Sequence, residues 1–312
     1  MAGVLGALIP VFLIIALGAV LRRTLLTDNM HWVGMEKLTY YILFPSLIVI
    51  SIARADLGGV AVIGVSTTLF ISIAGLGLAL ILLRLPLSRR LALASPSFTS
   101  LFQASVRWNS YVALAVSGGM AGPKGLAVSS VGLAVMIPLL NIMSVAVLAR
   151  HGARSEENRS LTVFDQVLRN PYVWSCAAGG LLHEVYSLIP PVLISFVDIL
   201  GRSSLALGLL VVGAGLRIES LHRPRAATLV SCIFKLAVLP AIAVSLGYAL
   251  GLREENLLVI AIVSSVPTAP NGYVLARQMG GDVPLLAEML TIQSLLAAIT
   301  MPLVVYIAAY II

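Results

Sequence analysis

Long apolar runs, separated by short charged stretches, cover almost the whole chain. Many of them approach about 20 residues, the length that a helix needs to cross the hydrocarbon core of a bilayer. Backbone polar groups in hydrocarbon must be satisfied within the segment, so such runs indicate transmembrane helices. The pattern predicts ten helices, at about 4–21, 33–53, 60–83, 97–118, 126–149, 171–185, 191–216, 226–250, 257–277 and 285–311.

Composition agrees with this interpretation. The 312 residues are 59 % hydrophobic and 11 % charged, whereas about 25 % of residues are charged in a soluble domain. The net charge of +7 is compatible with nucleic-acid binding, but most Lys and Arg residues lie in short loops. No basic stripe with interleaved aromatic residues is present. The expected partners are therefore membrane lipids and no nucleic acid.

The basic residues also predict the direction of the helices. Thirteen arginines lie in the loops after the first, third, fifth, seventh and ninth helices, whereas the opposite loops hold Arg54, Lys124 and Arg253. Cytoplasmic loops are enriched in Lys and Arg. The bias therefore places both termini outside and the loop after the fifth helix in the cytoplasm. Its regular alternation also supports the number of ten helices.

Two stretches of the chain echo each other. Each has an Asn, a small residue, Tyr and Val, with a Gly pair that begins six residues after the Val; one stretch starts at Asn109 and the other at Asn271. Each lies in the fourth helix of a group of five, and an odd number of helices per repeat inserts the two halves in opposite directions. Inverted repeats are typical of secondary transporters, which bind substrate near the midplane where broken helices meet.

The second stretch contains helix-breaking residues. Pro267 and Pro270 each lack a backbone donor, and Gly272 loosens the backbone further. The first stretch has no proline, and its polar side chains, Ser105 among them, are the sign of a break there. Ordinary kinked helices are the alternative, although an Asn in the middle of an apolar segment, such as Asn109, is harder to explain in that way.

Five charged residues lie inside predicted spans: Arg107, Asp198, Arg202, Lys235 and Glu288. A charge at the bilayer centre costs about 2.5–3.5 kcal/mol and needs a partner or a cavity. Asp198 and Arg202 are four residues apart, so they are expected to pair along one helix face. Glu288 lies near the cytoplasmic start of its helix and is expected to be solvated. For Lys235 the pattern leaves open whether it neutralises a carboxylate or extends to an interface.

Arg107 is the strongest candidate for substrate binding, because it lies two residues before Asn109. A guanidinium stays charged and binds carboxylates through two parallel hydrogen bonds, which suits an anionic substrate. The structural alternative is a pair with a helix-end carbonyl or with an acid elsewhere. The candidate substrate-binding residues are Arg107, Asn109, Tyr111, Lys235, Asn271 and Tyr273, and the candidate break residues are Ser105, Pro267, Pro270 and Gly272.

Other classes of function have less support. An intramembrane enzyme would need a nucleophile–base or metal constellation, whereas the four His residues lie at loops or helix ends and no His-Glu-x-x-His motif is present. A sensor would usually carry a soluble signalling domain, and a channel would more often show pore-lining motifs around an oligomer axis. No nucleotide-binding motif is present. We therefore expect no metal or cofactor, and coupling to an H⁺ or Na⁺ gradient or to the membrane potential.

The order and spacing of several motifs resemble the auxin efflux carrier family over nearly the whole chain. These motifs are Tyr-to-Ser at 40–46 with its Phe-Pro, Arg-x-Asn-Ser-Tyr at 107–111, Ile-Pro-Leu-Leu-Asn at 137–141, Asn-Pro at 170–171, Lys235 with Pro240, and Pro302. The resemblance implies an all-α membrane fold related to bile acid sodium symporters and plant auxin carriers. Two inverted five-helix repeats, at 1–150 and 170–312, would be joined by a cytoplasmic loop at 151–169.

In that fold the fourth and ninth helices are broken and cross each other. The first, second, sixth and seventh helices form a scaffold domain, and the other six form a moving transport domain. Family members carry organic anions, so the resemblance implies elevator-like transport of a small carboxylate between Asn109 and Asn271. It also implies a possible homodimer through the scaffold helices. The short connecting loop favours a bacterial-type carrier of the inner membrane, and the lack of a proline in the fourth helix is one departure from the family.

Overall fold

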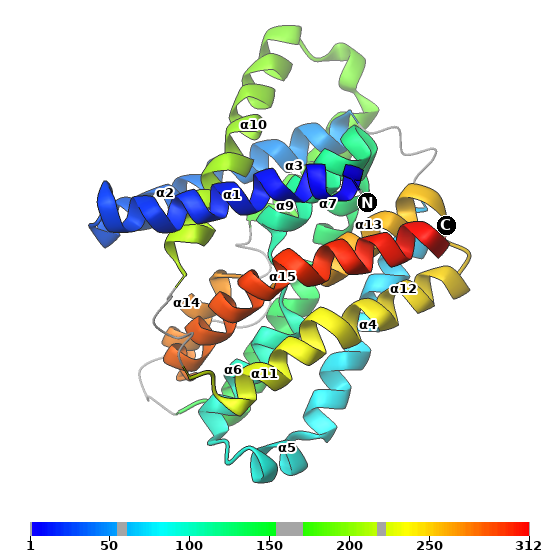
Figure 1. Ribbon diagram of the computed structural model, residues 1–312. Helices are drawn as coiled ribbons and strands as arrows, with labels where there is room; N and C mark the ends of the chain where they lie inside the picture. The colour runs from blue at the N-terminus through cyan, green and yellow to red at the C-terminus, as the bar shows by residue number, and fades with distance from the viewer. Residues whose placement is uncertain (1, 55–60, 154–170, 217–222, 312) are drawn as a thin grey trace.

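Helices form all of the regular structure in the computed structural model, which describes residues 2–54, 61–153, 171–216 and 223–311 (Figure 1). The elements are α1 (Ala2–Thr24), α2 (Asn29–Leu38), the π-helix η1 (Thr39–Leu43), α3 (Phe44–Ala53), α4 (Val62–Leu82), α5 (Arg84–Arg90), α6 (Ser95–Val106), α7 (Ser110–His151), α9 (Pro171–Glu184), the 3-10 helix η3 (Tyr186–Leu188), α10 (Pro191–Ala214), α11 (Ala226–Ile233), the π-helix η5 (Phe234–Val238), α12 (Leu239–Ala249), α13 (Glu254–Ser265), α14 (Asn271–Met279) and α15 (Val283–Ile311). Most of the predicted connecting loop, 151–169, lies outside the described residues.

Helical segments cover all or most of each of the ten predicted stretches. Within the described ranges, six helical segments are long and apolar enough to cross a membrane: Asn29–Ala53, Val62–Leu82, Ser95–His151, Pro191–Ala214, Ala226–Ala249 and Val283–Tyr310. The third of these segments contains both the fourth and the fifth predicted helix. Large apolar side chains face outward, with Leu13 63 % exposed and Ile299 72 % exposed. Soluble monomers rarely expose extended apolar surfaces. The fold is therefore that of a multi-pass membrane protein, while ten spans in inverted repeats stay a prediction.

The predicted turn between the fourth and fifth helices lies inside α7. This element has 42 residues, but Ala121 and Gly122 have non-helical dihedral angles. Gly122 has φ +55°, a conformation that is costly for residues with a Cβ atom. The chain therefore changes direction at the position where the hydrophobic pattern is interrupted.

The helices pack in two groups. In the first group α3 packs on α9 and α10, and α10 packs on α1; in the second, α4, α6, α7, α11, η5, α12, α13, α14 and α15 pack on one another. Figure 1 shows α1, α3 and α10 on one side and α4, α11 and α12 on the other. α7 also contacts α1, α3, α9 and α10. The division of the chain into a scaffold and a transport domain stays a prediction.

Glycines allow α1 and α10 to approach closely. A Cβ atom at Gly213 would collide with the Ile15 carbonyl group, and one at Gly18 would collide with the Leu210 carbonyl group. Small residues at such positions let membrane helices pack backbone against backbone. Shape complementarity between α1 and α10 therefore stabilises the first group.

Ion pairs hold charged side chains within each group. Asp198 pairs with Arg202 as predicted, at 2.8 Å between Oδ2 and Nε, and its other oxygen lies 2.7 Å from Nη1 of Arg54. In the second group, Nζ of Lys124 on α7 lies 3.1 Å from Oε2 of Glu255 on α13.

The expectation that Glu288 is solvated is wrong. Glu288 is only 6 % exposed, and its Oε1 accepts hydrogen bonds from the Arg225 backbone N–H at 2.7 Å and the Thr228 hydroxyl at 2.6 Å. Nε of Arg225 lies 3.4 Å from Oε2. The carboxylate therefore caps the start of α11, whose first backbone N–H groups have no partner within the helix.

Replacing Gly213 by alanine is expected to lower the melting temperature of the detergent-purified protein, because the added methyl group collides with Ile15. Such overpacking costs about 1–3 kcal/mol. Gly75→Ala in α4 is the matched control, since nothing lies within 4 Å of its Cβ position. Equal melting temperatures for the two variants would contradict the close approach of α1 and α10.

Candidate functional site

Two helix breaks meet inside the second group. α6 ends at Val106, and the next residue, Arg107, is extended with ψ 155°. α13 ends at Ser265, and Val266 is likewise extended with ψ 151°. The backbone N–H of Asn109 donates to the Pro267 carbonyl oxygen at 2.9 Å. The predicted breaks in the fourth and ninth helices are thus both present, and they touch each other.

The two breaks have different local causes. Pro267 has no backbone N–H, and the residue before a proline avoids the helical conformation, which ends α13. In the first break, Asn109 caps α7: its Oδ1 accepts from the N–H groups of Tyr111 at 3.1 Å and Val112 at 3.2 Å. An Asn in this role favours a new helix start. An asparagine cap therefore starts the second half of a broken helix that has no proline.

Gln293 of α15 bridges both breaks. Its Oε1 accepts from the Thr268 backbone N–H at 3.0 Å, and its Nε2 donates to the Ala104 carbonyl oxygen and the Ser231 hydroxyl, each at 3.2 Å. In continuous helices, Ala104 would accept from residue 108 and Thr268 would donate to residue 264. One side chain therefore replaces a backbone bond lost in each helix.

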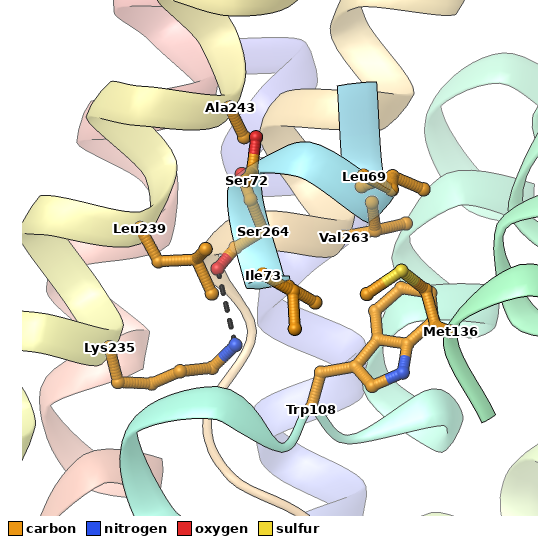
Figure 2. A pocket seen from close by; sticks show the side chains of 10 residues that line it. All are labelled: Leu69, Ser72, Ile73, Trp108, Met136, Lys235, Leu239, Ala243, Val263 and Ser264. Carbon is orange, nitrogen blue, oxygen red and sulfur yellow. Dashed lines mark hydrogen bonds between the residues drawn. The ribbon is translucent and has the colours of Figure 1, made fainter. Parts of the chain in front are cut away.

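Lys235, in the π-helix η5, is fully buried. Its Nζ points at the carbonyl oxygen of Ser264, 3.4 Å away, at the end of α13 (Figure 2). In the described part of the chain it forms no ion pair with an acidic side chain. The negative end of a helix dipole attracts cations. The adjoining cavity of about 10 Å³ is close to the smallest that holds one water molecule.

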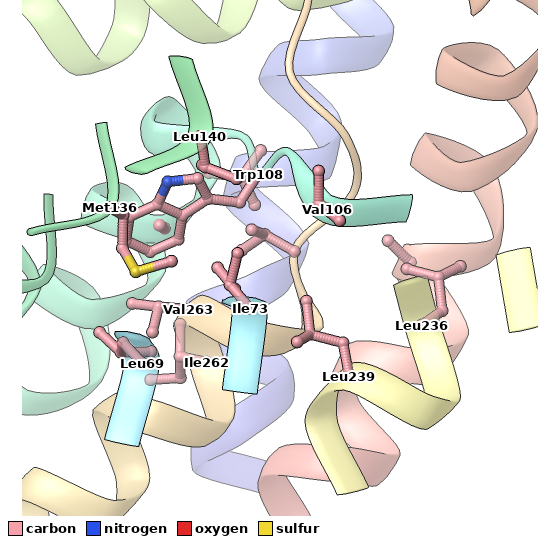
Figure 3. Packing of buried hydrophobic residues seen from close by; sticks show 14 of the residues in the cluster. Leu69, Ile73, Val106, Trp108, Met136, Leu140, Leu236, Leu239, Ile262 and Val263 are labelled. Atoms are coloured by element: carbon pink, nitrogen blue, oxygen red, sulfur yellow. The ribbon is translucent and has the colours of Figure 1, made fainter. Parts of the chain in front are cut away.

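Arg107 lies on the other side of the first break. It is 4 % exposed, and its Nε donates to the Ser144 hydroxyl at 3.2 Å and its Nη2 to Oδ1 of Asn141 at 3.3 Å. Both of these partners are neutral and lie on α7. The next residue, Trp108, lines the Lys235 cavity, and its ring packs among Leu69, Ile73, Met136 and Val263 (Figure 3).

The other candidate residues have distinct positions. Gly272 lies in the first turn of α14, where a Cβ atom would be 3.1 Å from Cδ of Arg107. The ring of Tyr111 packs against the first group, and its centroid lies 4.4 Å from the centroid of the Phe44 ring. Tyr273 is half-buried in the first turn of α14, and its backbone N–H donates to the Pro270 carbonyl oxygen at 2.9 Å.

Two of the remaining candidates contribute less. Ser105 is buried in the last turn of α6, before the break, and its hydroxyl donates to the Leu101 carbonyl oxygen at 2.8 Å. Asn271 begins α14, but its side chain lies outside the described part of the structure. The site thus brings Arg107, Asn109, Pro267 and Gly272 together, whereas Lys235 lies at a cavity that Trp108 also lines.

Residues 3–305 match the family model described as membrane transport protein. The chain belongs to this family. It is also similar to a protein from Methanothermobacter thermautotrophicus (strain Delta H) described as an uncharacterized transporter, with 24 % identity over 307 residues that cover 95 % of each chain. The resemblance to auxin efflux carriers is confirmed, and the protein is a membrane transporter and not an enzyme.

Sequence reasoning missed several parts of this transporter's site. Gln293, Asn141 and Ser144 were given no role, although each is a polar residue in an apolar helix. The π-helices were also missed. In each, the residue before a proline donates five residues back, Phe44 to Thr39 and Leu239 to Phe234. A proline within a predicted span was the available signal for both.

Gln293→Met is expected to destabilise the transporter, because it leaves the Thr268 N–H and the Ala104 carbonyl buried without their partner. Each such loss costs about 1–3 kcal/mol, which a thermal melt in detergent detects. Ser294→Ala is the control on the same helix, since the Ser294 hydroxyl donates to the Leu290 carbonyl within α15. If the two variants have the same melting temperature, the hydrogen bonds of Gln293 to the two breaks have no energetic importance.

Proposed function

We propose that this transporter moves a small organic anion, a carboxylate, by secondary active transport with elevator-like alternating access. The observation that carries the proposal is the buried guanidinium of Arg107 beside two touching helix breaks. Buried charge in a membrane protein is costly and usually functional. Arg107 is held by the Ser144 hydroxyl and the Asn141 amide oxygen, and both contacts orient its guanidinium.

The helix N-termini beside the two breaks also favour the binding of an anion. α7 and α14 both begin there, at Ser110 and Asn271, and a helix N-terminus carries a partial positive charge. Half-helix N-termini bind anionic substrate groups in several transporter folds. Arg107 and Gly272 of α14 are in contact range, so a carboxylate bound to Arg107 would also meet this end of α14. Contact of the substrate with Asn271, Tyr273 and Lys235 stays part of the proposal.

The packing of the helices supports an elevator. The two breaks, Gln293 and Lys235 all belong to the second group, so they can move together relative to the first group. We infer that the first group is the scaffold domain and the second the transport domain. The proposed arrangement has ten spans in two inverted repeats, both termini outside, in a bacterial inner membrane. An H⁺ or Na⁺ gradient or the membrane potential would drive the cycle.

Uptake of radiolabelled mono- and dicarboxylates into liposomes, with and without H⁺ and Na⁺ gradients, tests the substrate class. The wild type is expected to show saturable uptake, and Arg107→Ala to reduce it at least tenfold because the carboxylate loses its charged partner. Arg90→Ala, at the exposed end of α5, is the matched control and should transport normally.

A thermal melt of each variant separates loss of binding from loss of folding. Wild-type levels of uptake by Arg107→Ala would assign Arg107 a structural role. If no carboxylate moves under any gradient, the anion proposal fails.

A disulfide between the two groups is expected to stop an elevator. A Cβ atom at Gly208 would lie 3.0 Å from Cγ of Tyr111, and disulfides join Cβ atoms about 3.5–4.5 Å apart. In a background without Cys176 and Cys232, the oxidised pair Tyr111→Cys with Gly208→Cys should lose uptake and regain it on reduction.

The control disulfide joins two helices of the same group. Ile52→Cys on α3 with Gly179→Cys on α9 uses positions in contact, and uptake should persist after oxidation. The single variant Tyr111→Cys shows whether loss of the Tyr111 ring by itself changes uptake. Full uptake by the oxidised 111–208 pair, with the cross-link confirmed by mass spectrometry, would contradict the elevator.

A further inference from the structure

Gln103 has an exceptional environment for a buried amide. It lies on α6 with no exposed surface, and neither its Oε1 nor its Nε2 has a hydrogen-bond partner in the described part of the chain. Buried polar side chains are nearly always hydrogen-bonded, and an unpaired one calls for an explanation such as a role in binding. Gln293, which is equally buried, uses both ends of its amide.

The Gln103 amide points at the same place as Arg107. Gln103 lies in the last turns of α6, and Arg107 directly follows this helix, four residues later. The Arg107 backbone N–H still donates to the Gln103 carbonyl oxygen at 2.9 Å, so the two side chains share a face. A Cβ atom at Gly272 would lie 3.6 Å from Oε1 of Gln103 and 3.1 Å from Cδ of Arg107. The first turn of α14, with the positive end of its dipole, is therefore flanked by a guanidinium and an unpaired amide.

We propose that Gln103 is a specificity-determining residue that binds a second, uncharged polar group of the substrate, such as a hydroxyl or a carbonyl. The proposal rests on the proposed function, in which Arg107 binds the carboxylate. An amide offers both donors and an acceptor, so it can pair with a hydroxyl in either direction and with a carbonyl through its N–H groups. A second carboxylate would be matched better by another cation.

The spacing between Gln103 and Arg107 limits the size of the substrate. Residues one turn apart rise by about 6 Å along a helix, and both side chains converge on the first turn of α14. The carboxylate and the second polar group should therefore be separated by one or two carbon atoms. The substrate class is a short hydroxy- or oxo-monocarboxylate.

The test compares uptake of 2-hydroxybutyrate, 2-oxobutyrate and unsubstituted butyrate by the reconstituted wild type and by Gln103→Met. Methionine has nearly the same shape and forms no comparable hydrogen bond. The wild type should prefer at least one substituted acid to butyrate by about tenfold, which corresponds to about 1.4 kcal/mol. Gln103→Met should bring this ratio close to one while butyrate uptake continues.

Thermal melts of the ligand-free proteins supply a readout besides transport. Gln103→Met should melt at or above the wild-type temperature, because it removes an unpaired buried amide, whereas Gln293→Met should melt lower. An unchanged substrate ratio in Gln103→Met overturns the inference. So does equal wild-type uptake of all three acids, which leaves the carboxylate proposal intact. Uptake of no carboxylate at all, in this set or in the wider panel, overturns both.

Discussion

Two broken helices in a low-dielectric interior leave backbone groups that must find partners, and this requirement organises the centre of the molecule. Groups that lose their helical partners at the breaks are paired by other means: the Asn109 N–H by Pro267, the Thr268 N–H and Ala104 carbonyl by Gln293, and the Ser264 carbonyl by Lys235. An unpaired backbone group in hydrocarbon costs several kcal/mol. The non-helical backbone at the two breaks is therefore stable because Gln293 of α15 and Lys235 of η5 lie where they can pair with its polar groups.

The extended backbone of the first break also separates the two buried cations. Successive side chains of an extended segment point to opposite sides, so Arg107 and Trp108 diverge. Trp108 is 4 % exposed and packs in the apolar cluster beside the Lys235 cavity (Figures 2 and 3). Arg107 turns instead toward α7 and the first turn of α14. Lys235 thus balances the carbonyl end of α13, while Arg107 lies where helix N-termini meet, which is the better position for an anion.

The sequence revealed features that depend on local chemistry. Pro267 and Pro270 mark a break whatever surrounds them, and the Asp198–Arg202 pair follows from a spacing of four on one helix. Gln293 and Glu288 could not be assigned, because their roles depend on which remote segments pack against α15. Asn109 was recognised as unusual, but its action as a cap required knowing that the backbone ahead of it is extended. Gln103 could not be singled out, since nothing in the local sequence distinguishes a paired buried amide from an unpaired one.

The distribution of ion pairs bears on how the proposed movement could occur. Arg54–Asp198 joins helices of the first group, whereas Lys124–Glu255 and Arg225–Glu288 join helices of the second. Where α7 meets the first group, Tyr111 packs on the Phe44 ring in a T-shaped arrangement and contacts Gly208. Dispersion contacts of this kind are individually weak and non-directional, so they can be exchanged as one surface slides over another. An ion pair or backbone bond at that boundary would instead have to break in every cycle. Each group is held together by strong, directional ion pairs, whereas Tyr111 and Gly208 form a weaker contact at the boundary. This difference suits two rigid bodies that move relative to each other.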